Sequence, residues 1–120
     1  MPLIKSDNVN LVPEPLMIPI QIPILDTFHN ARKKAEKLLE ELDELTAEAC
    51  AELVDIDHLL EEFYDVAQVI AGLLLARFKE KVSFEDAVQL TRITMMDASA
   101  KHLDKMEHRA VERGWMIAHE

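Results

Sequence analysis

The stretch LLEEFYDVAQVIAGLLLARFK, residues 59–79, decides the fold class. Its apolar residues recur at helical spacing, and Gly72 is the one residue in it that weakens a helix. From Val66 to Ala76 such a helix is apolar around much of its circumference, and a helix of that kind is covered on most sides. The stretch therefore predicts a largely buried helix in an all-α protein.

One more helix is expected on each side of this central helix. All five Pro lie within the first 23 residues, so no proline interrupts a helix in the rest of the chain. The preceding helix should begin near Asp26 or Thr27, both acceptable N-caps, and run to about Leu53. Asp55 or Asp57 can cap the central helix.

Ser83 followed by Asp86 resembles a capping box and predicts a third helix, which should run to about Arg113 and end at Gly114. The expected fold is an antiparallel bundle of three main helices. Residues 25–120 form one helical domain, and residues 1–24 form an extended, Pro-rich N-terminal arm. Apolar residues alternate along the arm, which would be a strap over its own subunit or an arm that crosses to a partner.

The formal net charge of −10 argues against nucleic acid as a partner, because a protein that grips phosphates directly needs the opposite sign. An acidic protein can still bind a nucleotide when a metal ion bridges carboxylate and phosphate. The run Val66–Ala76 is too short to cross a bilayer, and prolines break the apolar start of the chain. We therefore expect a cytoplasmic protein without membrane contact.

Glu40, Glu41 and Glu44 fall within roughly a 100° arc of the first helix. Like charges stacked in this way repel each other. A bound cation would relieve the repulsion, and so would water around a solvated acidic face. This segment alone leaves both interpretations open.

Glu62 lies inside the edge of the apolar face of the central helix, and Asp65 lies just outside it, one turn on. A carboxylate at such a border loses solvation unless something pairs with it. It could reach water or a basic side chain, but a metal would explain both acids together. Hard cations such as Mg²⁺, with Mn²⁺ as an alternative, take oxygen ligands. The five His have no zinc-ligand spacing and are interpreted as surface or core residues.

The pattern Glu40-Glu41-x-x-Glu44, followed after 17 residues by Glu62-x-x-Asp65, resembles the EExxE…ExxD signature of the all-α NTP pyrophosphohydrolases. That superfamily includes MazG, the dimeric dUTPases and phosphoribosyl-ATP pyrophosphatase. The resemblance implies that Mg²⁺ is held by Glu41, Glu44, Glu62 and Asp65. The catalytic residues would be Glu40, which positions or deprotonates the attacking water, and Glu41.

By the same resemblance, the expected activity is cleavage of a nucleoside triphosphate between its α- and β-phosphates. Lys37 resembles a basic residue of the family that lies just before the acidic pair, and it would bind substrate. Two alternatives stay open: hydrolysis of phosphoribosyl-ATP on the same scaffold, and a catalytically silent helical module that binds a partner.

A basic stripe near the chain end, made of Lys105, Arg109 and Arg113, is similar to the phosphate-binding end of family members. The Asn that relatives carry there is absent. The alternative is that these cations complement the C-terminus of their helix and pair with nearby Glu residues.

The central helix has more apolar surface than two helices and an arm can cover. Soluble monomers rarely expose a large apolar patch. We therefore expect a homo-oligomer, a dimer or a tetramer, that completes the core, and the family resemblance points the same way.

Overall fold

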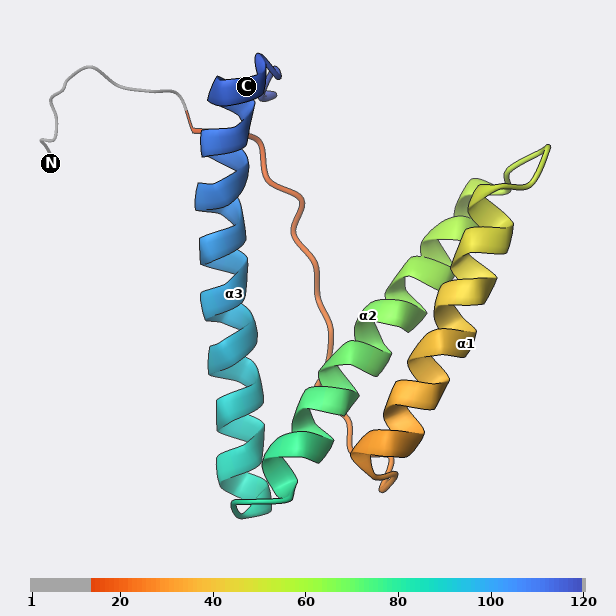
Figure 1. The fold of residues 1–120 in the computed structure, drawn as a ribbon, viewed down its shortest axis with the longest axis vertical. Coiled ribbons are helices and arrows are strands. Elements are labelled where there is room, and N and C mark those ends of the chain that lie inside the picture. The colour runs from red at the N-terminus through yellow and green to blue at the C-terminus, as the bar shows by residue number, and fades with distance from the viewer. Residues whose placement is uncertain (1–13, 120) are drawn as a thin grey trace, which may run out of the picture. The chain divides into compact units, whose positions relative to one another are not determined.

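The structure is a computed structural model, and it describes residues 14–119. Within these residues it contains three helices and no strand: α1 (Ala31–Ala49), α2 (Ile56–Lys79) and α3 (Phe84–Arg113) (Figure 1). The expected all-α class is confirmed. Residues 1–13 of the expected arm lie outside the described part of the chain, and residues 14–30 form neither helix nor strand.

The chain forms two compact units, and each is described by itself. One contains residues 21–100, and therefore α1, α2 and the first half of α3. The other contains residues 101–119 together with residues 14–20. Across residues 14–119, no helix combines the length and the hydropathy that crossing a bilayer requires.

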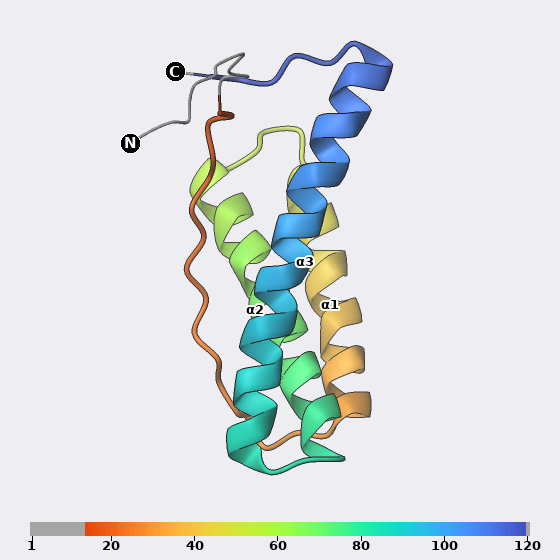
Figure 2. The ribbon, with the colours of Figure 1, turned by 90° about the vertical axis from the view of Figure 1, so that its left-hand side faces the viewer.

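Helices α1 and α2 lie side by side as a hairpin (Figures 1 and 2). The hairpin core is small. Leu75 is 1% exposed, and Val66 and Val69 are buried beside it on α2. On the α1 side, the buried residues Lys34 and Glu41 carry charge. Burying a charge is costly unless it is paired, so these two side chains set this face apart from a purely apolar packing surface.

Helix α1 begins later than expected, because Asp26 is engaged elsewhere. Its Oδ1 accepts a hydrogen bond of 2.7 Å from the main-chain N–H of Phe28, and its Oδ2 pairs with Lys79 Nζ at 2.5 Å. Phe28 has a φ of 63°, in the left-handed region that non-glycine residues rarely adopt. This turn takes the chain out of helical geometry, so the prediction of a start at Asp26 or Thr27 was wrong.

Asn30 caps α1 instead, with its Oδ1 accepting a hydrogen bond of 2.8 Å from the N–H of Lys33. The helix also ends earlier than expected, at Ala49 rather than near Leu53. At this end Asp55 N–H donates to Glu48 Oε1 over 3.3 Å, which ties the connection between α1 and α2 back to α1.

The other helix ends follow their local signals. Asp55 caps α2 by accepting a hydrogen bond of 3.2 Å from the N–H of His58. Ser83 Oγ accepts from the N–H of Asp86 at 3.2 Å at the start of α3. Gly114, with a φ of 67°, follows the last residue of α3. These three expectations are confirmed.

The segment around Pro23 lies along α2 (Figure 2). Gln68 Nε2 donates a hydrogen bond of 2.7 Å to the Pro23 carbonyl. This contact fits the strap over its own chain, and an arm that crosses to a partner stays a prediction.

Candidate metal centre

Three carboxylates meet between α1 and α2. Glu41 comes from α1, and Glu62 and Asp65 come from α2. One oxygen from each residue lies within 4.8 Å of the other two. Glu41 is 6% exposed and the Glu62 side chain 12%, whereas Asp65 is exposed. Three oxygen donors this close can share one hard cation.

Two of the oxygens in this cluster, Glu41 Oε2 and Glu62 Oε2, are buried, and among the described residues neither has a hydrogen-bond partner. The other oxygen of each carboxylate is engaged: Glu41 Oε1 with Lys37 Nζ at 3.0 Å, and Glu62 Oε1 with His58 Nε2 at 3.2 Å. A buried acceptor without a donor costs about 1–3 kcal/mol, and more when it is charged. A cation bound between the two carboxylates would remove that cost.

Glu44 lies against the same cluster from the exposed side of α1. The negative charge of Glu41, desolvation and the charge of Glu62 raise the pKa of Glu44 above its ordinary value. Two ionised carboxylates cannot hydrogen-bond, because neither has a proton to donate. A proton on Glu44 relieves the repulsion and would also supply that donor, so its acid form is favoured here.

We expect Glu44→Gln to stabilise the metal-free protein at neutral pH. A carboxyl whose pKa is raised by folding destabilises the fold when ionised, so the wild type loses stability as pH rises above the ordinary pKa of 4.5. Glutamine is uncharged and escapes that loss. Urea unfolding in EDTA at about pH 4 and about pH 7 tests this. A wild type at least as stable as the variant at the higher pH would contradict it.

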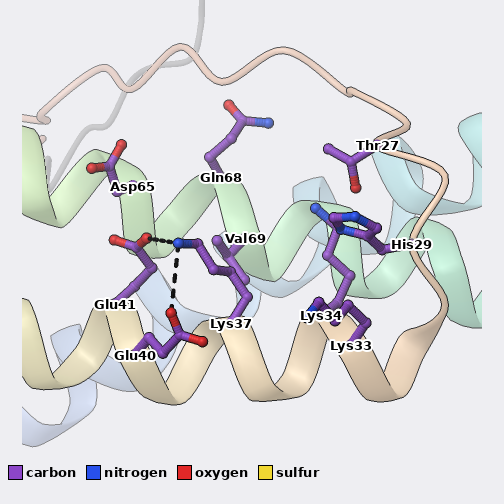
Figure 3. A pocket seen from close by; sticks show the side chains of 10 residues that line it. All are labelled: Thr27, His29, Lys33, Lys34, Lys37, Glu40, Glu41, Asp65, Gln68 and Val69. Carbon is purple, nitrogen blue, oxygen red and sulfur yellow. Dashed lines mark ion pairs between the residues drawn. The ribbon is translucent and has the colours of Figure 1, made fainter.

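A cavity of about 530 Å³ opens beside the cluster (Figure 3). It shares Glu41 and Asp65 with the carboxylate cluster. Figure 3 shows these acids at one end of the cavity, and Lys33, Lys34 and His29 toward the other. The lining residues are Thr27, His29, Lys33, Lys34, Lys37, Glu40, Glu41, Asp65, Gln68 and Val69. The cavity is therefore acidic where a cation would bind and basic further along.

Lys37 lies at the acidic end of the cavity. Its Nζ lies 3.0 Å from Glu41 Oε1 and 3.9 Å from Glu40 Oε1 (Figure 3). The hydrogen bond to Glu41 raises the pKa of Lys37, so its ammonium stays charged. Glu40 itself is exposed, with 65% of its side chain accessible. It can therefore reach a water in the cavity.

Lys34 is a buried cation that the sequence analysis did not single out, and it is 7% exposed. Its side chain passes over Gly72 of α2. A Cβ at that position would stand 3.0 Å from Lys34 Nζ and 3.1 Å from its Cε. The absence of a side chain at Gly72 thus lets a lysine lie against α2 at the lining of the cavity.

His58 is a second residue that sequence reasoning missed, since it was interpreted as a surface or core residue. Its Nδ1 lies 2.9 Å from Glu48 Oε2, and its Nε2 faces Glu62. The hydrogen bond with Glu48 and the charge of that carboxylate raise the pKa of His58. The signal was present in the sequence, because His58 and Glu62 are four residues apart on one helix.

The basic stripe lies in the other compact unit, on the second half of α3. There the Arg113 guanidinium lies 5.0 Å from the centre of the Trp115 ring. The neighbouring cavity of about 390 Å³ is lined by Asp104, Glu107, His108, Val111 and Glu112. That lining contains none of the three stripe residues Lys105, Arg109 and Arg113, so their expected role in binding substrate stays a prediction.

Comparison with models of known protein families, with characterised proteins and with solved structures gave no match to this chain. The chemistry of the site is therefore argued from its own geometry.

Proposed function

We propose that this protein is a Mg²⁺-dependent nucleoside triphosphate pyrophosphohydrolase of the all-α, MazG-like type. The observation that carries the proposal is the pair of buried carboxylate oxygens, Glu41 Oε2 and Glu62 Oε2, that have no donor among the described residues. Together with Asp65 they form an all-oxygen donor set, which suits Mg²⁺ or Mn²⁺ better than zinc. Glu44, the fourth ligand expected from the sequence, adjoins this set without being part of it.

The division of charge in the cavity supports a polyphosphate substrate. Mg²⁺ in proteins usually keeps several positions for water and substrate phosphates. Lys37 lies against the acids, and Lys33 and Lys34 line the cavity beyond them, where further phosphate groups of the same substrate would lie. In a chain with a net charge of −10, three lysines at one cavity supply positive charge that would attract an anion.

The proposed reaction is the hydrolysis of the bond between the α-phosphorus and the oxygen that bridges to the β-phosphate. Water supplies the new P–O bond, and the products are a nucleoside monophosphate and pyrophosphate. Glu40, exposed at the cavity, orients the water and accepts its proton. The cation would neutralise phosphate charge and make the attacking water more acidic. Lys37 would bind substrate next to the acids.

The test is a panel of nucleoside triphosphates assayed for pyrophosphate, with Mg²⁺, with Mn²⁺ and with EDTA. We expect pyrophosphate rather than orthophosphate, and none in EDTA. Phosphoribosyl-ATP belongs in the panel, because its cleavage would identify the alternative enzyme. The absence of pyrophosphate from every substrate would leave the silent interaction module as the better explanation.

We also expect the protein to be a homo-oligomer, a dimer or a tetramer. Leu60, Phe63 and Ile70 are between 38% and 49% exposed, and they follow one another along α2 at spacings of three and seven residues. A stripe with that repeat is typical of a helix that packs against another helix. A second copy that covers this stripe would bury apolar area at roughly 25 cal/mol per Å².

Light scattering at micromolar concentration should give a multiple of 13.7 kDa. Ile70→Glu should lower the measured mass, because it places a charge in the contact. The matched control is Leu53→Glu, at a residue that is 91% exposed between α1 and α2. A wild-type mass near 13.7 kDa would contradict the prediction.

A further inference from the structure

His58 is held between two carboxylates that come from different helices. Its Nδ1 lies 2.9 Å from Glu48 Oε2 on α1, and its Nε2 lies 3.2 Å from Glu62 Oε1 on α2. The two ring nitrogens point in different directions, so a single ring orientation serves both contacts. The Glu48 contact therefore fixes the direction in which Nε2 faces Glu62.

Hydrogen bonds from main-chain N–H groups to side-chain oxygens hold the same arrangement. Glu48 Oε1 accepts from the N–H of Asp55, and Asp55 Oδ1 accepts from the N–H of His58. Glu48 thus contacts both the cap of α2 and the ring of His58. The side chain of Glu48 is 17% exposed, whereas that of His58 is 51% exposed.

The result is a carboxylate with one oxygen occupied and one free. His58 occupies Oε1 of Glu62, while Oε2 is buried and lacks a partner among the described residues. Glu41 shows the same division: Lys37, four residues earlier on its helix, occupies Oε1 and leaves Oε2 free. Each helix thus holds its buried glutamate with a cationic or imidazole group one turn before it.

We propose that Glu48 and His58 are a positioning pair that fixes the orientation of Glu62, so that one oxygen of this carboxylate stays available to the cation. Partners behind a metal ligand orient it and commonly change metal affinity about 10- to 100-fold when removed. The inference rests on the proposed metal centre. His58 touches neither the cation nor the substrate in this role and acts through Glu62.

The experiment is calorimetric titration of the full chain with Mn²⁺ alone, without nucleotide. We expect His58→Ala to weaken binding by about tenfold or more. Glu48→Gln should weaken it less, since the amide keeps an oxygen for Asp55 N–H. Because both residues act through one contact, the double variant should bind no more weakly than His58→Ala. His58→Gln, which keeps an N–H donor one turn before Glu62, should recover part of the affinity.

His108→Ala is the matched control. His108 is an exposed histidine with an acid four residues away on its helix, as His58 has, but that acid is Asp104, in the other compact unit. The Mn²⁺ affinity of the His108→Ala variant should equal that of the wild type. Circular dichroism checks helix content, and if His58→Ala fails to fold, Glu48→Gln and His58→Gln decide the question.

The outcomes separate the two proposals. A wild type that binds Mn²⁺, with His58→Ala binding equally or more tightly, overturns the positioning role alone. An equal loss of affinity in His108→Ala also overturns it, because the effect would then not depend on Glu62. A wild type that binds no Mn²⁺ overturns the metal centre, and the positioning role with it.

Discussion

Replacing Glu62 by glutamine is expected to abolish pyrophosphate release and to remove Mn²⁺ binding. The amide keeps the size and shape of the side chain and loses its charge. Since Glu62 is largely buried and contributes one of the two oxygens without a donor, the neutral variant leaves the cation with too little negative charge. A coupled pyrophosphate assay and a Mn²⁺ titration measure the two losses, and circular dichroism should show unchanged helix content.

Glu61→Gln is the control for this experiment. Glu61 precedes Glu62 on α2 and is exposed, so the same chemical change there should leave metal binding and activity near wild-type levels. Activity that survives Glu62→Gln would mean that Glu62 is not a ligand. Equal losses in both variants would point to the general charge of the helix instead of the site.

Leu75→Ala is expected to destabilise the protein by about 3 kcal/mol, within the range of roughly 2–5 kcal/mol for buried leucines. Leu75 is 1% exposed, and among residues 14–119 it is the largest apolar side chain that is fully buried. The loss combines apolar transfer and the cavity left behind, because neighbouring side chains relax only partly. Urea unfolding at fixed protein concentration gives the change in the free energy of unfolding.

Leu53→Ala provides the comparison, since Leu53 is 91% exposed and its truncation should change stability by less than about 0.5 kcal/mol. If the two variants were equally stable, Leu75 would not lie in a packed core. Concentration must be held fixed, because association would add to the measured stability.

The sequence predicted the ends of α2 and α3 well because their signals are local. Asp55, Ser83 and Gly114 each act within a few residues of the helix end that they define. The start of α1 was predicted wrongly for the opposite reason. Asp26 forms an ion pair with Lys79, 53 residues later. This contact replaces the N-capping role that the sequence alone predicts for the Asp26 side chain.

The candidate site was predictable in part. Glu41, Glu62 and Asp65 meet because acids three residues apart share a helix face, and two adjacent helices can bring two such faces together. The expected placement of Glu62 inside an apolar border corresponds to its low exposure. Neither the burial of Lys34 nor the contact of His58 with Glu48 follows from periodicity, because each depends on which groups the neighbouring helix presents.

Because Lys34 contacts Gly72, the amino acid that fits at one of these positions depends on the amino acid at the other. With alanine at position 72, the added carbon would stand 3.0 Å from Lys34 Nζ, so the lysine side chain would have to shift by a few tenths of an ångström. A shorter residue at position 34 would tolerate the alanine, but it would forfeit the cation at the cavity. We therefore expect homologous chains that carry lysine at position 34 to favour glycine at position 72, and chains with a shorter residue at position 34 to accept alanine there.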